Sequence, residues 1–446
     1  MNKRNMKWTS VLALAALSLV NVACEDEPDA YESTDGKPTI SYIRPLKASA
    51  KDSLLTAASM QENIVVVGNN LRSVKQIDFN DRTAILNTSY MTDNTIIVQV
   101  PSDLPEKVSD KMYFITTAND TVEYDFNVII PAPRINSMEN EWVKEGDDAV
   151  IVGDFFLDYD NFPLTVSFSD GSQLDRSMIK SITKTAITFE VPVDAPAGYI
   201  TVTSMYGATR SPFHFHDSRG MLFDFDTPNP VSNVVLGNHG WHGQVIESDE
   251  TSLSGNFLRL GAPDLAFDGA WNDGNFSFEY WPGTWDQDAD GNYLYHGDGI
   301  KLTDLVDFSN WENMSLKFEM YVPKSNPWTC APMQVIFAGT DRVSYFAANN
   351  TFFHNDSDKF GRALYAPWRS TGSYDTGDKW VTVTLPLGGI NGVFNMYYDG
   401  TAADKSFTSA DDFASLTLFV VNGGGYDGTP GMPVIKIDNI RAVPNK

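Results

Sequence analysis

Cysteine, basic charge and long hydrophobic runs are all scarce in this sequence of 446 residues. Its two cysteines, Cys24 and Cys330, are too few for a disulfide framework or a cysteine-rich metal cluster. Lysine and arginine total 32 against 58 acidic residues, a net charge of −26. Because phosphate backbones are bound by basic surfaces, we expect no nucleic-acid partner. The sequence also lacks a Gly-x-Ser-x-Gly elbow, a His-Glu-x-x-His motif, a Walker loop and a dinucleotide fingerprint.

The sequence does contain what a folded globular protein needs. Hydrophobic residues make up 42% of it, aromatic residues 12% and charged residues 20%. This composition is too apolar for a largely disordered chain. At about 100–200 residues per domain, the length predicts roughly two to four domains, each large enough to bury a core.

Residues 1–23 predict a signal peptide. Three basic residues precede a short hydrophobic stretch at residues 11–20. About ten such residues are too few to span a bilayer, which needs about 20. The stretch ends at residues 21–24 (NVAC), which resemble a bacterial lipobox with asparagine in place of the usual leucine. Cys24 is then the expected lipidation site; the alternative is a plain secretory signal with a chance cysteine.

Residues 24–37 predict an acidic linker, because Glu25, Asp26, Glu27 and Asp29 follow the cysteine directly. Such a charge run is usually a solvated spacer. It also resembles the acidic export tag of lipoproteins from gut anaerobes. That resemblance implies a lipid-anchored protein of the outer membrane that faces the cell exterior.

Residues 38–131 and 132–216 look like two copies of one unit. The matching segments are 64–68 (IVVVG) with 149–153 (AVIVG), 77–79 (IDF) with 166–168 (VSF), and 95–101 (TIIVQVP) with 186–192 (AITFEVP). Apolar and polar residues alternate within these segments, which is the pattern of strands with one buried face. About seven such strands in about 90 residues predict a small β-sandwich.

The two copies resemble the immunoglobulin-like IPT/TIG domains. The resemblance rests on a leading Pro-x-Ile, an apolar strand that ends in glycine, and a strand that ends in Val-Pro. Neither copy contains a cluster of histidines, cysteines or paired carboxylates that would indicate chemistry. We therefore expect both to act as spacers.

Residues 220–446 differ in composition and predict one larger domain. Eight of the ten tryptophans lie there. Apolar and polar residues alternate at 315–322, and turn-rich stretches separate the runs, which predicts a larger jelly-roll-like β-sandwich. The segments at 223–226 (FDFD) and 437–440 (IDNI) resemble the framing strands of jelly-roll carbohydrate-binding modules. The expected fold class is thus all-β, with two Ig-like sandwiches followed by a larger one.

The order of lipobox, acidic segment, IPT/TIG pair and tryptophan-rich sandwich resembles the cell-surface glycan-binding lipoproteins of polysaccharide-utilisation systems. Within them it is similar to those with a C-terminal domain of the xyloglucan- and β-glucan-binding type. The resemblance implies a non-catalytic protein that captures extracellular polysaccharide. We expect no cofactor and no metal. It also implies a TonB-dependent transporter complex as its partner at the outer membrane.

The expected glycan-binding residues are aromatic side chains on polar loops. A pyranose ring presents a flat face of C–H groups, on which a tryptophan or tyrosine ring can stack while polar neighbours orient the hydroxyls. Proline beside an aromatic residue marks loop backbone, where recognition residues concentrate. The candidate residues are Trp271, Tyr280, Trp281, Trp285, Trp328, Trp368 and Arg369. A core role is the alternative for each tryptophan, and for Trp311 and Trp380 it is the one we expect.

Three other interpretations remain open from sequence. Residues 286–291 (DQDADG) resemble the first half of a calcium loop, but glycine replaces the expected glutamate at position 297, which favours an acidic hairpin turn. A glycoside hydrolase would need two carboxylates about 5–10 Å apart in a tryptophan-lined cleft. A protein-binding adhesin would show exposed apolar patches on the repeats.

Overall fold

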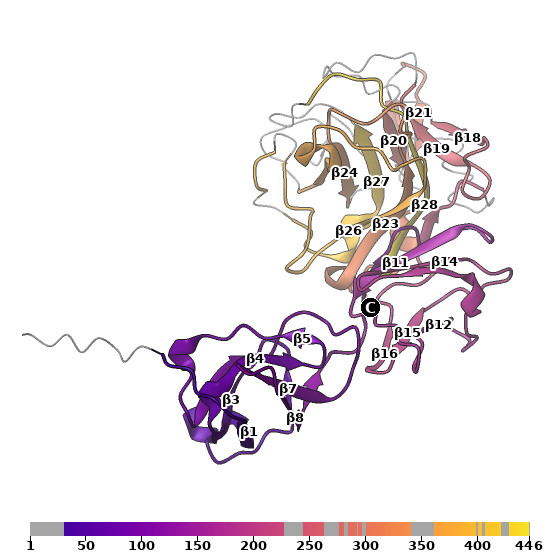
Figure 1. Cartoon of the computed structure of the whole chain (residues 1–446). Helices are drawn as coiled ribbons and strands as arrows, with labels where there is room; N and C mark the ends of the chain where they lie inside the picture. The colour runs from indigo at the N-terminus through magenta and orange to yellow at the C-terminus, as the bar shows by residue number, and fades with distance from the viewer. Residues whose placement is uncertain are drawn as a thin grey trace, which may run out of the picture. The chain divides into compact units, whose positions relative to one another are not determined.

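The computed structural model describes residues 31–226, 244–262, 276–280, 284–291, 293–296, 300–339, 361–397, 400–403, 406–420 and 428–445. Within these ranges the regular structure is β-strand, interrupted by short 3₁₀ turns, so the predicted all-β class is confirmed. No helix in these ranges is long and apolar enough to cross a membrane. The chain divides into two compact units, Met1–Pro131 and Ala132–Lys446 (Figure 1).

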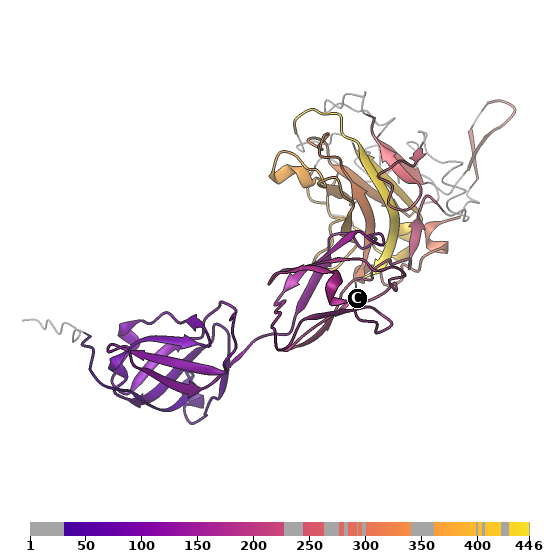
Figure 2. The same ribbon diagram turned by 45° about the vertical axis from the view of Figure 1, so that its right-hand side comes forward.

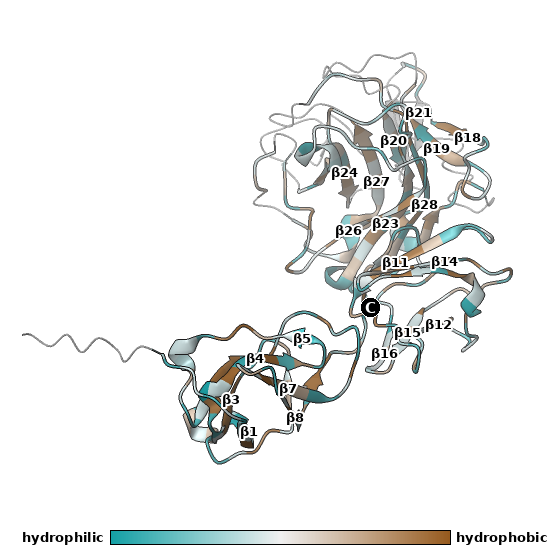
Figure 3. Ribbon diagram, viewed as in Figure 1, coloured by the Kyte–Doolittle hydropathy of each residue, from teal (hydrophilic) through white to brown (hydrophobic). Residues whose placement is uncertain are grey.

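The first unit is a small sandwich of two antiparallel sheets with orders β1-β3-β6 and β5-β4-β7-β8, and a parallel pair, β2-β9. Its strands are β1 (Thr39–Pro45), β2 (Ala57–Ser59), β3 (Asn63–Asn69), β4 (Val74–Phe79), β5 (Arg82–Thr83), β6 (Thr95–Gln99), β7 (Lys111–Thr116), β8 (Thr121–Asp125) and β9 (Asn127–Ile129). Its 3₁₀ turns are η1 (Ala48–Ala50), η2 (Leu71–Ser73) and η3 (Thr88–Tyr90). Alternate residues such as Ile64 and Val66 enter the core, and Figure 3 shows brown (hydrophobic) and teal (hydrophilic) segments within the strands of this unit, such as β4.

The second repeat, at the start of the second unit, has the same two-sheet design, with orders β10-β11-β14-β13 and β12-β15-β16. Its strands are β10 (Arg134–Met138), β11 (Asp148–Asp154), β12 (Thr165–Ser167), β13 (Ile179–Ile182), β14 (Ala186–Glu190), β15 (Thr201–Ser204) and β16 (Gly207–Arg210), with the turn η4 (Arg176–Met178).

Equivalent glycines allow the first strand of each repeat to lie close to its partner, β1 beside β3 and β10 beside β11. A Cβ atom on Gly68 would lie 2.0 Å from the carbonyl oxygen of Thr39, and one on Gly153 would lie 2.0 Å from that of Arg134. No side chain tolerates such an approach, so both positions require glycine. The same register shift follows in both first strands, at Ile40 and at Ile135.

The C-terminal sandwich packs a six-stranded sheet, β18-β19-β28-β23-β26 with β17 paired to β28, against a four-stranded sheet, β20-β27-β24-β25. The larger sheet contains β17 (Met221–Phe223), β18 (Val245–Glu247), β19 (Phe257–Leu260), β23 (Met314–Tyr321), β26 (Val381–Pro386) and β28 (Ile435–Pro444), the long yellow strand in Figure 2. The smaller sheet contains β20 (Ser277–Tyr280), β24 (Met333–Ala338), β25 (Ala363–Tyr365) and β27 (Ser415–Val420). The domain also contains a hairpin of β21 (Thr284–Gln287) and β22 (Tyr293–His296). Its 3₁₀ turns are η6 (Leu302–Asp304), η7 (Trp311–Asn313), η8 (Pro367–Ser370) and η9 (Ala410–Phe413).

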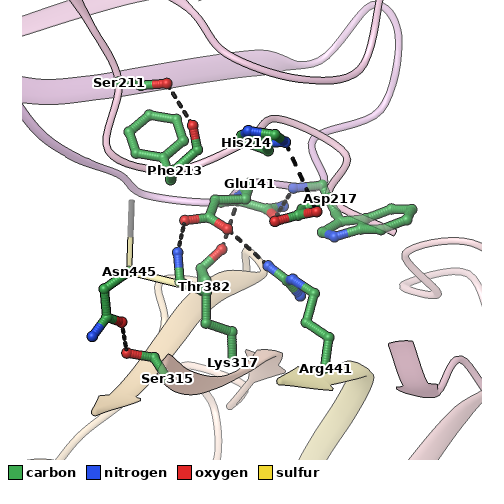
Figure 4. Close-up of polar contacts among 12 residues, drawn as sticks. Glu141, Ser211, Phe213, His214, Asp217, Ser315, Lys317, Thr382, Arg441 and Asn445 are labelled. Atoms are coloured by element: carbon green, nitrogen blue, oxygen red, sulfur yellow. Dashed lines mark hydrogen bonds and ion pairs between the residues drawn. The ribbon is translucent and has the colours of Figure 1, made fainter. Parts of the chain in front are cut away.

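The outer face of the larger sheet is charged, and the second repeat covers it (Figure 4). Glu141 of the repeat accepts hydrogen bonds from Lys317 Nζ at 2.6 Å and from Arg441 Nη2 at 2.8 Å. Arg441 also forms a two-pronged pair with Glu319, at 2.7 and 3.0 Å. Two acids and two bases therefore neutralise one another in a buried layer, which is the condition for burying charge.

Further contacts join the same two domains. The backbone N–H of Thr382 donates to the Glu139 carbonyl at 2.7 Å, and Lys144 Nζ donates to the Ser252 carbonyl at 2.6 Å. Trp142 packs against a cluster that contains Trp380. The second repeat is thus part of one compact unit with the C-terminal sandwich. Its expected role as a spacer stays a prediction.

Candidate functional site

Two of the predicted platform residues, Trp328 and Trp368, belong to the core. Trp328 is 0% exposed and Trp368 is 3% exposed. Both indole N–H groups donate to the carbonyl oxygen of Ala331, at 3.0 and 3.1 Å, and Ala331 has a left-handed backbone with φ of 55°. The prolines do mark loop backbone, but these loops fold back on the core, so the expectation of solvent-exposed rings is wrong at both positions.

Tyr280 is also a core residue rather than an exposed one. It alternates with Glu279 along β20, and its ring lies with Phe223 and Phe278 in the main core cluster. Its hydroxyl donates to the carbonyl of Ile300, and burial raises the pKa of that hydroxyl. The period-two pattern of the strand explains this placement, which corrects the prediction of a binding-site tyrosine.

The other predicted positions have different outcomes. Arg369 is exposed on η8, as a binding residue must be. Trp285 lies on β21, but its side chain falls outside the described residues, as do Trp271 and Trp281 altogether. Cys24, the expected lipidation site, also falls outside them.

Trp311 and Trp380, which we expected to be core residues, both pack against other side chains of the domain. Trp311 is partly buried, with Phe407 packed edge-on against it at a centroid separation of 5.8 Å. Trp380 is buried, and its indole N–H donates to the Thr251 carbonyl at 2.6 Å. It lies on the outer side of the larger sheet, in the junction with the second repeat.

The acidic segment at 286–291 forms the turn between β21 and β22, as the hairpin interpretation predicted. Asp288 Oδ1 accepts the backbone N–H of Asp290 at 2.9 Å, and Gly291 adopts a φ of 82°. Across the described part of the chain, no cluster of three or more histidine, cysteine or carboxylate groups is arranged for a metal ion.

The smaller sheet carries polar side chains on the face turned away from the core, which we call the polar face. It comprises Glu279, Gln334, Arg362 and Thr417. Glu279 and Thr417 are directly opposed in the register of β20 and β27, and Arg362 Nη1 donates to Gln334 Oε1 at 2.9 Å. All four are buried and have partners within the chain.

The polar face carries groups of the kinds that bind hydroxyl-rich ligands, but all four side chains are at most 3% exposed and have partners within the chain. A carboxylate and an amide oxygen accept hydrogen bonds from hydroxyl groups, whereas a guanidinium donates to ring and hydroxyl oxygens. Neighbouring strands, about 4.8 Å apart, hold these groups in fixed register. The expected site residues do not include this face, although the alternation of Ser277 and Glu279 with Phe278 and Tyr280 along β20 is the signal that could have found it.

Comparison with known proteins agrees with a carbohydrate-related role for this domain. A family model described as the surface glycan-binding protein B xyloglucan binding domain matches residues 215–444. The crystal structure of surface glycan-binding protein PbSGBP-B from Prevotella bryantii is 49% identical and has a TM-score of 0.78. That comparison covers 92% of this chain and 100% of the Prevotella chain.

A more distant relative is an IPT/TIG domain-containing protein from Bacteroides ovatus. It is 25% identical over 256 residues, which are 54% of this chain and 50% of that protein. The chain therefore spans about half the length of this curated relative.

Proposed function

This chain belongs to the surface glycan-binding protein B family, and from that premise we propose that its second unit binds a β-glucan-type polysaccharide such as xyloglucan. The observation that carries the proposal is the family match over residues 215–444, where the fold is the C-terminal sandwich.

The proposed function is binding without catalysis. Its support is that the matched family and the Prevotella relative are both described as glycan-binding proteins. The test is a calorimetric titration of residues 25–446 with xyloglucan, followed by an assay for new reducing ends. Saturable heat without reducing ends is expected, whereas steady release of reducing ends would favour the glycoside hydrolase.

We propose that Cys24 anchors the protein by a lipid to the outer membrane, with the folded units facing the cell exterior. The motif at residues 21–24 and the acidic residues after it support this placement. Cys24→Ala should release the protein from the membrane fraction, and its retention there would contradict the anchor. Neutral residues in place of Glu25, Asp26 and Glu27 should leave lipidation intact but abolish exposure to protease added to whole cells.

We further propose that the first unit contacts a protein partner, the TonB-dependent transporter complex. The supporting observation is a set of large apolar side chains exposed on this unit, among them Ile85 at 92% and Leu54 at 71%. Exposed apolar side chains mark protein contacts where they form a continuous patch. Ile85→Ser and Leu54→Ser should reduce co-purification with the transporter and leave glycan binding unchanged; unchanged co-purification would exclude this surface.

A further inference from the structure

A groove of about 650 Å³ lies between the second repeat and the C-terminal sandwich. Its floor is the outer face of the larger sheet at Lys317, Thr382 and Thr384, and one wall is residues 136–139 at the end of β10. Tyr365 and Tyr374 line it further along. The volume is within the roughly 300–1,000 Å³ typical of small-molecule sites.

The lining has the chemistry of a site for neutral, hydroxyl-rich ligands. It combines hydroxyls, amides, carboxylates and tyrosine rings: Ser137, Thr376, Thr382, Thr384, Asn136, Asn445, Glu139, Asp375, Tyr365 and Tyr374. The ammonium group of Lys317 is already paired with Glu141 at 2.6 Å, so the free charges of the groove are negative. A phosphate or other anion would be repelled, and a purely apolar ligand would leave the polar lining unsatisfied.

Several hydrogen-bonding groups of the groove are available to a ligand. The Glu139 side chain is exposed and has no hydrogen-bond or ion-pair partner among residues 31–226 or the other described ranges. β26 is the edge strand of its sheet, and its Thr382 N–H points outward to the Glu139 carbonyl at 2.7 Å. Along a strand, the backbone N–H and C=O groups of every second residue point to the same side. Those of Thr384 therefore point to the same open edge as those of Thr382.

The walls of the groove are held in a fixed relation. Glu141 joins the repeat to Lys317 and Arg441 of the sheet, and its backbone N–H donates to Thr382 Oγ1 at 2.8 Å. The two tyrosines are linked to each other by a side-chain hydrogen bond. A site assembled before the ligand arrives loses less entropy on binding.

We propose that this interdomain groove is a glycan subsite that binds a short segment of neutral oligosaccharide, an inference that rests on the proposed function. It contributes contacts from the second repeat that the C-terminal sandwich alone lacks. Glu139 and the Thr384 backbone bind sugar hydroxyls, and the tyrosines contact the ring faces. The polar face is separate, since it belongs to the other sheet of the sandwich.

The test titrates residues 25–446 with cellohexaose, a β-1,4-linked glucan hexasaccharide, by calorimetry and by amide chemical shifts. Thr384→Trp fills the groove from an exposed position, and Glu139→Ala removes its unpartnered carboxylate. The matched control is Glu250→Ala, another exposed acid. It lines only a second groove beside the same junction, which Glu139 also borders. Melting temperatures confirm that the three variants remain folded.

Thr384→Trp is expected to lower the number of oligosaccharides bound per chain or to weaken binding at least about tenfold. Glu139→Ala should weaken binding by a smaller factor, and Glu250→Ala should not change it. If the wild-type chain binds the oligosaccharide and Thr384→Trp binds it with the same stoichiometry and affinity, the groove is not a glycan subsite. The proposed function would still stand. Absence of binding to any β-glucan or xyloglucan oligosaccharide by the wild-type chain would overturn both.

Discussion

Arg441 on the last strand donates from Nη2 to Glu141 Oε2 of the second repeat at 2.8 Å, although 300 residues separate them in sequence. Arg441 is fully buried, and its other nitrogen binds Glu319 at 2.7 Å. Burial alone would lower the pKa of Arg441, but the two carboxylates more than offset this and raise it, so its positive charge is retained. This pair joins the second repeat to the C-terminal sandwich within one compact unit.

The first prediction is that Glu141→Ala strongly destabilises the second unit. The substitution leaves Arg441 and Lys317 buried without one of their carboxylate partners, and breaking a buried pair in this way costs about 3–5 kcal/mol. Urea denaturation of residues 132–446 measures the loss. The control is Asp154→Ala, which breaks the exposed pair with Arg134 and should cost about 0–1 kcal/mol. Equal losses in the two variants would contradict the structural role of Glu141.

The second prediction concerns domain dissection. If the single larger domain expected at residues 220–446 were independent, it would fold alone and bind glycan as tightly as the full mature chain. The structure changes this expectation, because the fragment lacks Glu141 and Trp142, which cover the charged face of its larger sheet. Residues 132–446 should melt at a clearly higher temperature than residues 220–446. Equal melting temperatures, measured by calorimetry, would show that the junction contributes little.

The third prediction is that Trp328→Ala and Trp368→Ala act on stability: each variant should lower the free energy of unfolding. Each removes a buried ring and leaves the Ala331 carbonyl with one indole donor fewer, so about 3–5 kcal/mol should be lost. The neighbouring exposed residue provides the control, since Arg369→Ala should leave the melting temperature nearly unchanged. A tryptophan variant that bound glycan weakly while retaining wild-type stability would restore the stacking interpretation.

The fourth prediction is a pH dependence that originates at Asp438. Burial, with the nearby negative charges of Asp226 and Glu319, raises the pKa of Asp438 to about 8. In the unfolded chain an aspartate titrates near pH 3.9, so only the folded state holds this proton between about pH 4 and 8. Stability from this group is therefore complete at low pH and is lost as pH rises through that window, by up to about 1.4 kcal/mol per unit.

Asp438→Asn removes this titration and should flatten the stability profile between pH 5 and 8, as followed by chemical denaturation. Asp226→Asn removes only one of the neighbouring charges and should have a smaller effect in the same direction. An unchanged profile in Asp438→Asn would show that this carboxyl is not the group responsible.

Much of the fold could be predicted because its signals are local. The glycines at 68 and 153 end apolar strands in both repeats, and the structure shows the same close approach to a carbonyl at each. Trp311 precedes a strand and packs on the core as expected. Period-two alternation likewise identified β23, where Leu316 and Phe318 enter the core.

The site was harder to predict because its determinants are long-range. Alternation assigned Lys317 and Glu319 to a polar face of β23, but it could not show that the second repeat covers that face and buries every residue of the strand. Nor could it show that the loop of Trp328 folds inward, because the left-handed backbone of Ala331 has no signature in an alanine. Proline identifies a loop; where that loop packs is decided by the rest of the molecule.

The most direct test of the central claim is affinity gel electrophoresis of residues 132–446 beside residues 25–131, in gels that contain xyloglucan, mixed-linkage β-glucan, mannan or starch. We predict that the fragment 132–446 is retarded by xyloglucan or mixed-linkage β-glucan, as strongly as the full mature chain, while the fragment 25–131 runs as in a gel without polysaccharide. Retardation of the fragment 25–131 alone, or of no fragment in any gel, would contradict the account.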